Sequence, residues 1–166
     1  MSGTPLIEVK NLKKYFRVPA GQNHAVDDVS FTINRGETLG VVGESGCGKS
    51  TLGRTLIRLL EATDGQVLLN GEDITHISGK KLRQAREKLQ IVFQDPYSSL
   101  NPRLRIESTI MEPLQRSGRF KNKTDMKEEA NRLMELVGID QRLRRAIPTS
   151  WTVAAVSASV LPVLWR

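Results

Sequence analysis

The chain has 166 residues, enough for one ordinary domain built around one main hydrophobic core. Its 25 Lys and Arg outnumber its 18 Asp and Glu, and the net charge of +7 favours contact with nucleotides, nucleic acid or an anionic membrane surface. A hydrophobic share of 39% excludes a mainly disordered protein. Cys47 is the only cysteine, which excludes an internal disulfide and favours a reducing, cytosolic location. The charged residues among the first thirty leave no apolar segment for a signal peptide.

The order of short apolar segments predicts strands that alternate with helices, as in an α/β protein. Strands are expected at 6–10, 29–34, 39–42, 67–69 and 91–93. Helices are expected at 49–60 and 80–88, with Gly65 ending the first helical region. A later helix should begin at a capping box of Asp125 and Glu128 and stop at Gly138. Its predicted buried face consists of Met126, Ala130, Leu133, Met134 and Val137.

The main chemical signal is a glycine-rich loop between the 39–42 strand and the 49–60 helix. The loop matches the phosphate-binding pattern G-x-x-x-x-G-K-[ST] with Gly43, Glu44, Ser45, Gly46, Cys47, Gly48, Lys49, Ser50 and Thr51. Glycines let the backbone N–H groups turn toward a phosphate, and the Lys49 ammonium adds positive charge. The Ser50 hydroxyl can ligate Mg²⁺. The loop therefore predicts a nucleotide site, in which we interpret Cys47 as a small, tolerated residue.

The segment 91–103, IVFQDPYSSLNPR, distinguishes among the families that use such a loop. It resembles the glutamine loop of ABC transporter ATP-binding subunits, and DPYSSLNP is similar to the branch that serves dipeptide and oligopeptide importers. The resemblance covers about residues 6–138. It implies a P-loop NTPase fold of the ABC type, truncated, with an antiparallel β element at the N-terminus. It also implies that ATP is the nucleotide and that Gln94 contacts Mg²⁺ and the attacking water.

The same resemblance places an aromatic ring under the adenine, at the end of the segment LKKYF. Phe16 aligns best with that position and Tyr15 second, although either ring could instead belong to the core. His24 and His76 stand alone in polar surroundings, and we interpret them as solvated loop histidines.

The resemblance implies a subunit that couples ATP hydrolysis to uptake of dipeptides, oligopeptides or related solutes. The implied partners are a second ATP-binding subunit, transmembrane permease subunits and, indirectly, a solute-binding protein, with no nucleic acid. The implied location is the cytoplasmic face of the bacterial inner membrane. Two alternatives are a soluble P-loop kinase or other NTPase, and a basic nucleic-acid-binding module built on Lys80, Lys81, Arg83, Arg86 and Lys88.

The composition changes near Ala146, which suggests a family-like part at 1–146 and a different tail at 147–166. From Ile147 to Trp165 no residue is charged, and polar residues dilute the segment too much for a membrane span. The family's signature motif, its Asp-Glu strand and its switch histidine are absent from the sequence, so binding of ATP without turnover is expected. Read one base earlier, suitable codons for 146–166 give YPHELDGGxRQRIxxARALA, which resembles the family's signature region. A frameshift near Arg145 or Ala146 is therefore our hypothesis, and the alternative is a native C-terminus.

Overall fold

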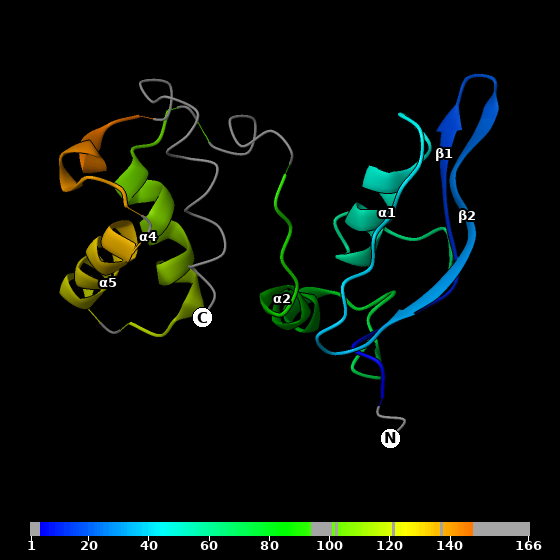
Figure 1. The fold of residues 1–166 in the computed structure, drawn as a ribbon, viewed down its shortest axis with the longest axis horizontal. Helices are drawn as coiled ribbons and strands as arrows, with labels where there is room; N and C mark the ends of the chain where they lie inside the picture. The colour runs from blue at the N-terminus through cyan, green and yellow to red at the C-terminus, as the bar shows by residue number, and fades with distance from the viewer. Residues whose placement is uncertain (1–3, 94–100, 102, 121, 137, 148–166) are drawn as a thin grey trace. The chain divides into compact units, whose positions relative to one another are not determined.

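The computed structural model describes residues 4–93, 101, 103–120, 122–136 and 138–147, and the chain divides into two compact units (Figure 1). The first unit spans 1–91 and the second spans 92–166. Each unit contains its own cluster of buried apolar side chains. The expectation of one main core was therefore wrong, and each unit is described by itself below.

A four-stranded antiparallel sheet forms the base of the first unit. Strands β1 (Ile7–Val18) and β2 (Gly21–Ile33) form a long hairpin, in which Ile7 pairs with Ile33 and Val18 with Gly21. The other edge of β1 pairs with β3 (Asp64–Leu69), and β3 pairs with the short strand β4 (Glu72–Asp73). The strand order is β2-β1-β3-β4. The predicted strands at 6–10, 29–34 and 67–69 and the antiparallel element are confirmed, and each observed strand is longer than predicted.

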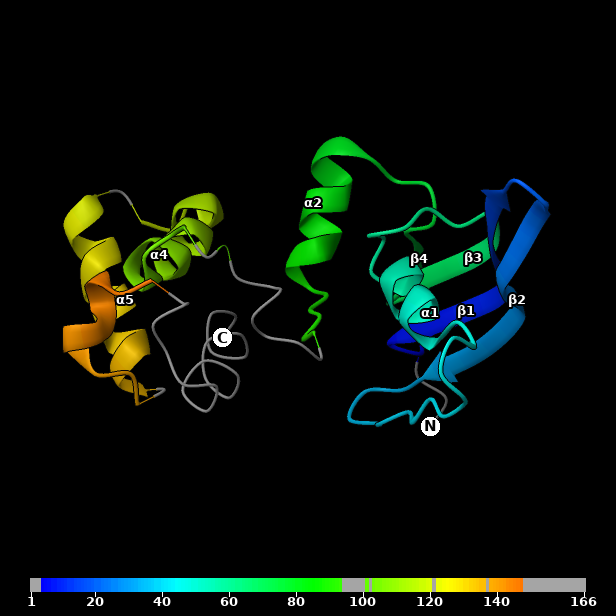
Figure 2. The same cartoon turned by 90° about the horizontal axis from the view of Figure 1, so that it is seen from above.

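Helix α1 (Lys49–Leu56) packs against one face of this sheet (Figure 2). Its Leu52 joins the buried cluster that Val9, Leu12, Val26 and Val67 form on the strands. Because an amphipathic helix is stabilised mainly by its buried face, these contacts hold α1 in place. The sheet and α1 therefore fix the position of the glycine-rich loop that leads into this helix.

The predicted helix 49–60 is correct in place but too long at its end. The helix stops at Leu56, and Arg58 adopts a left-handed backbone conformation with φ of 61°. The Arg58 side chain is buried, and its Nη2 donates a hydrogen bond to the Ile77 carbonyl at 3.3 Å. The Arg86 guanidinium of α2 (Gly79–Glu87) in turn donates to the Arg58 carbonyl. Residue 58 thus connects the end of α1 to α2, and the predicted helix 80–88 is confirmed.

We had predicted that Gly65 ends the first helical region. It lies instead at the beginning of β3. Its φ is +86°, and a Cβ atom there would lie 2.3 Å from the Asn11 carbonyl oxygen and 2.6 Å from the Leu12 Cα. The backbone of β3 therefore approaches β1 more closely than any side chain would allow. The glycine at this position serves the sheet and not the helix.

Two segments predicted to be buried strands, 39–42 and 91–93, are not strands in the structure. In the first, Leu39, Val41 and Val42 are 41%, 50% and 93% exposed, and in the second Val92 is 62% exposed. A strand is defined by hydrogen bonds to a neighbour, and no strand of the described sheet pairs with either segment. Their apolar composition is typical of strands that are buried in a sheet. Composition does not indicate whether a neighbouring strand is present to pair with them.

Helices make up the second unit. Helices α4 (Ile106–Ser117) and α5 (Lys123–Leu136) and the 3₁₀ helix η1 (Gln141–Arg145) enclose a cluster that includes Ile110, Leu114, Ala130 and Met134. We had not predicted α4. The predicted capping box is wrong, because α5 begins before Asp125, whose N–H donates to Asn122 Oδ1 at 2.8 Å. Within the described parts of the chain, no helix has both the length and the apolar character to cross a bilayer.

The close approach at Gly65 yields a prediction for stability. Gly65→Ala should lower the free energy of unfolding by about 1–3 kcal/mol more than Gly71→Ala, because both positions have left-handed φ but only Gly65 faces backbone atoms. A Cβ at Gly71 would lie 3.2 Å from the flexible Thr4 side chain. Chemical denaturation of both variants measures the difference, and equal losses would contradict the close packing of β3 on β1.

Candidate phosphate and base site

The glycine-rich loop 43–51 leads directly into the first turn of α1. Gly46 and Gly48 have φ values of +83° and +95°, which lie in the left-handed region that favours glycine. A Cβ atom at Gly48 would lie only 1.9 Å from the Ala25 carbonyl oxygen of β2. The loop therefore packs directly on the hairpin backbone, and this contact fixes the beginning of α1 against β2. The contact with Ala25 had no signal in the sequence.

The Lys49 ammonium lies inside the loop. Its Nζ donates to the Gly43 carbonyl oxygen at 2.8 Å and also to the Glu44 carbonyl oxygen. The Cys47 Sγ lies 3.4 Å from the same nitrogen. Three groups of the loop thus surround one cation, in the place where phosphate oxygens can become its partners instead.

The beginning of α1 offers further donors. Its N-cap residue, Gly48, has no side chain to accept from the first N–H groups, and no side-chain cap hydrogen bond is formed. Such a helix terminus carries partial positive charge and attracts an anion. Ser50 is exposed and Thr51 half-buried at this end, so the Ser50 hydroxyl is accessible to a metal ion bound with a phosphate.

Cys47 is exposed within the loop and lies close to Gly43, where a Cβ atom would come within 2.7 Å of the Cys47 Sγ. Gly43 thus allows the thiol to fold inward toward Lys49. Ser45 and Gly46 lie in a turn, and the side chains from Gly43 to Cys47 are exposed. This geometry suits a loop that closes around a compact anion.

The two faces of the β1–β2 hairpin separate the two candidate aromatic rings. Residues directly opposite each other in a β ladder project to the same face. Val26 is opposite Lys14 and packs with Leu52, so the Lys14 side of the hairpin faces α1. The Lys14 Nζ lies 5.0 Å above the centre of the Phe16 ring, which places Phe16 on this face as well. Phe16 therefore shares a face with α1 and the loop that begins it.

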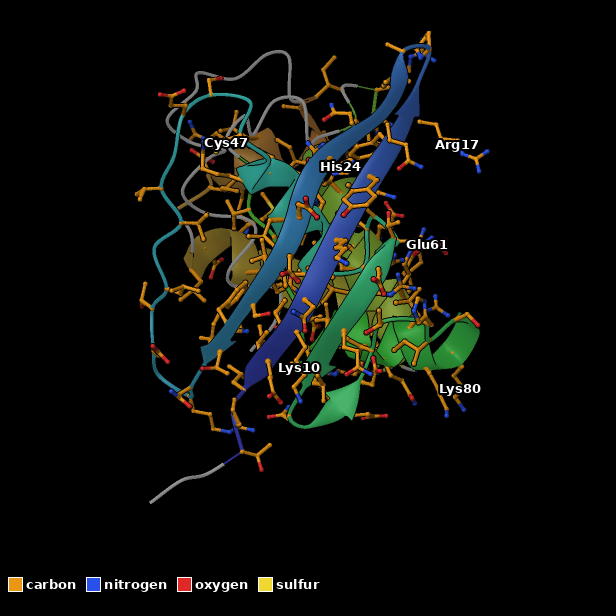
Figure 3. The ribbon with its side chains drawn as sticks, turned by 90° about the vertical axis from the view of Figure 1, so that its right-hand side faces the viewer. Lys10, Arg17, His24, Cys47, Glu61 and Lys80 are labelled. Carbon is orange, nitrogen blue, oxygen red and sulfur yellow. The ribbon has the colours of Figure 1, made fainter. Side chains whose placement is uncertain are left out.

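Tyr15 projects from the opposite face of the hairpin. Its ring stacks on His24 with centroids 3.8 Å apart and an interplanar angle of 12°, and its hydroxyl donates to Asp27. The His24 Nδ1 lies 3.5 Å from the other Asp27 oxygen. In Figure 3 the strands stand in front of α1, and His24 lies on the near face, away from that helix. We had expected His24 to lie in a solvated loop. It lies instead in β2 and belongs to a stacked cluster.

The hydrogen bond between Tyr15 and Asp27 shifts both groups. It raises the pKa of Tyr15 to about 12, mainly because the neighbouring carboxylate opposes loss of the phenol proton. The same hydrogen bond lowers the pKa of Asp27 below its usual value, with a smaller contribution from His24. This cluster lies on the face of the hairpin away from α1, so Phe16 is the one of the two candidate rings that lies on the α1 side.

Gln94, the residue expected to contact Mg²⁺ and water, lies outside the described residues, as does the tail 148–166. The structure therefore brings together the loop 43–51, the beginning of α1 and the hairpin that carries Phe16. Arg86 is engaged with the Arg58 carbonyl, which ties α2 to the end of α1.

A model of the ABC transporter family matches residues 26–157, a range that runs past Ala146. The chain is 49% identical over 144 residues to the oligopeptide transport ATP-binding protein OppF of Bacillus subtilis (strain 168), and this match covers 86% of the chain and 47% of OppF. It is 45% identical to the oligopeptide transport ATP-binding protein AppF of the same organism, over 81% of the chain and 43% of AppF. The chain thus spans about half the length of the curated relatives it matches.

The fold is similar to that of solved ATP-binding cassettes. A dimeric structure of the cassette MJ0796 bound to ADP and Pi superposes with a TM-score of 0.76 at 23% identity, over 88% of this chain and 63% of that one. The cbiO1 protein of Clostridium perfringens superposes with a TM-score of 0.69 at 22% identity, over 97% of this chain and 62% of that one. The predicted ABC-type P-loop NTPase fold is confirmed, over 63% and 62% of these two solved chains.

The Tyr15–Asp27 hydrogen bond yields a prediction for pH dependence. In a Tyr97→Phe background, which leaves Tyr15 as the single tyrosine, absorbance titration should give a pKa of about 12. Because this pKa is raised, the stabilisation is complete below pH 10 and is lost as the pH rises toward 12. Asp27→Asn should move the tyrosine pKa down toward 10, because the carboxylate is gone.

The control for this titration is Asp28→Asn. Asp28 is the weakest of the charges that act on Tyr15, and its carboxylate accepts a hydrogen bond from Asn11 instead. This variant should leave the tyrosine pKa near that of the parent. A shift as large as that of Asp27→Asn would show that general negative charge, and not the hydrogen bond, controls Tyr15.

Proposed function

The chain belongs to the ABC transporter family, and on this premise we propose that it is the ATP-binding part of an importer for dipeptides, oligopeptides or related solutes. The observation that carries the proposal is the loop 43–51, with the Lys49 ammonium held inside it by the Gly43 and Glu44 carbonyls. The names of the relatives OppF and AppF support the peptide branch.

In the proposed mechanism the loop binds the phosphates of ATP. Backbone N–H groups of the loop and of the uncapped beginning of α1 would donate to the oxygens, and Lys49 would bind the β and γ phosphates. Phe16 stacks under the adenine, since it lies on the hairpin face that α1 packs against. The tight packing of Gly48 on Ala25 keeps the phosphate and base parts of the site at a fixed distance.

Mg²⁺, when bound, would neutralise charge on the phosphates and orient the γ-phosphoryl group for attack by water. The exposed Ser50 hydroxyl fits a ligand role, and Gln94 is the proposed second ligand and water contact. The chain's own residues otherwise position the nucleotide by hydrogen bonds and charge. In an assembled importer, two such parts would close on two ATP molecules and act on permease subunits at the cytoplasmic face of the inner membrane, with a solute-binding protein delivering the solute.

We further propose that 1–146 is the family-like part and that a frameshift produced the tail 147–166. The absence of charged residues from Ile147 to Trp165 and the translation in the neighbouring frame support this proposal, whereas the family match as far as residue 157 overlaps the beginning of the tail. The nucleotide sequence decides between a frameshift and a native C-terminus. Codons that cannot encode the signature region in the neighbouring frame would contradict the frameshift.

Lys49→Ala is expected to weaken ATP binding about a hundredfold or more, because the phosphates lose a charge-assisted partner inside the loop. Lys80→Ala, on the exposed side of α2, removes the same charge and should leave the affinity unchanged. Equilibrium titration of both variants with a fluorescent ATP analogue measures the difference. Equal affinities would contradict the assignment of the loop as the phosphate site.

The chain 1–166 should bind ATP without hydrolysing it. Transfer of the γ-phosphoryl group to water needs a carboxylate to polarise the water, and the only acid after residue 138 is Asp140. The Asp140 side chain already accepts a hydrogen bond from the Arg142 N–H at 2.8 Å. Phosphate release by the purified chain is compared with that of a protein in which the frame is restored and extended. Equal rates would show that the short chain is a complete ATPase.

A further inference from the structure

The Lys14 side chain has an unusual position among the lysines of β1. Lys10 forms an ion pair with Glu8 at 3.0 Å, and Lys13 forms one with Asp64 at 3.3 Å. In the part of the chain that the structure describes, the Lys14 ammonium has neither an acidic partner nor a hydrogen bond. Among the described residues, the ammonium has an electrostatic contact with the Phe16 ring, at 5.0 Å from the ring centre.

This contact lies within the range of a cation–π interaction, in which the negative face of an aromatic ring attracts a cation. Lys14 and Phe16 are both half-buried, and Lys14 lies opposite the buried Val26, on the side of the hairpin that faces α1. The ammonium therefore covers a face of the ring on the same side as the phosphate loop. A purine that stacks on that face needs the same space.

We propose that Lys14 is a specificity-determining residue of the nucleotide site, whose ammonium covers the Phe16 ring until an adenine base displaces it. The inference rests on the proposed role of Phe16 as the adenine platform. It assigns Lys14 two opposite effects. The ammonium competes with the base for the ring, and its positive charge attracts the polyphosphate on the same side of the hairpin.

The two effects separate when a ligand with a base is compared with one that has none. The test measures the affinities of the full chain for ATP and for inorganic tripolyphosphate, both with Mg²⁺, and follows the ratio between them. The charge of Lys14 acts on both ligands and largely cancels in the ratio. Competition for the ring acts on ATP alone and remains.

Lys14→Met keeps the length and apolar stem of the side chain but removes the cation. It should raise the ratio of ATP to tripolyphosphate affinity about two- to fivefold, the range expected for an exposed cation–π contact. Lys14→Arg should lower the ratio, because a guanidinium stacks more strongly on an aromatic ring. Lys10→Met, on the same strand but paired with Glu8, is the matched control and should leave the ratio unchanged.

Phe16→Ala distinguishes a failure of this inference from a failure of the platform itself. The platform predicts that Phe16→Ala lowers the ratio and that Lys14→Met has no effect on it in the Phe16→Ala background. If Phe16→Ala lowers the ratio but Lys14→Met leaves it unchanged or lowers it, competition at the ring is wrong and the platform stands. If Phe16→Ala has no effect on the ratio, the adenine platform is wrong and the inference fails with it. Thermal unfolding of each variant verifies that the hairpin is intact.

Discussion

The contact between Gly48 and the Ala25 carbonyl is the constraint on which the rest of the site depends. A Cβ atom at residue 48 would overlap the carbonyl oxygen, so the loop can pack this closely on β2 only with glycine at that position. The contact fixes the beginning of α1 against the hairpin, and the beginning of α1 carries Lys49. The position of the Lys49 backbone relative to the hairpin that carries Phe16 is thereby set by backbone packing.

The hairpin itself is stabilised differently on its two faces. On the α1 side, Val9, Leu12 and Val26 bury apolar surface against Leu52. On the other side, Tyr15, His24 and Asp27 form a polar and aromatic cluster on an exposed surface. The long hairpin can therefore present Phe16 and Lys14 near its end while it remains anchored from both sides. A two-stranded hairpin without such support is marginally stable in water.

The sequence predicted those parts of the structure that depend on local chemistry. The loop 43–51 was recognised because glycines, a lysine and a hydroxyl occur at fixed spacing, and α2 because its many charged residues are typical of a surface helix. The end of α1 and the role of Gly65 were missed because they depend on distant backbone, the Ile77 carbonyl in one case and Asn11 in the other. Helix α4 lies beyond the proline-rich segment, where periodicity gave no prediction, and its burial against α5 stabilises it.

The segments 39–42 and 91–93 show how far apolar composition and strand formation can differ. Their apolar residues are typical of strands buried on both faces, yet Val42 and Val92 are largely exposed and neither segment has a partner in the described sheet. The geometry of the loop 43–51 does not depend on these two segments. It rests on the contact of Gly48 with Ala25, on the hydrogen bonds of Lys49 and on the first turn of α1. The candidate phosphate site is thus local to the first unit, and its geometry does not depend on whether 39–42 and 91–93 pair with a sheet.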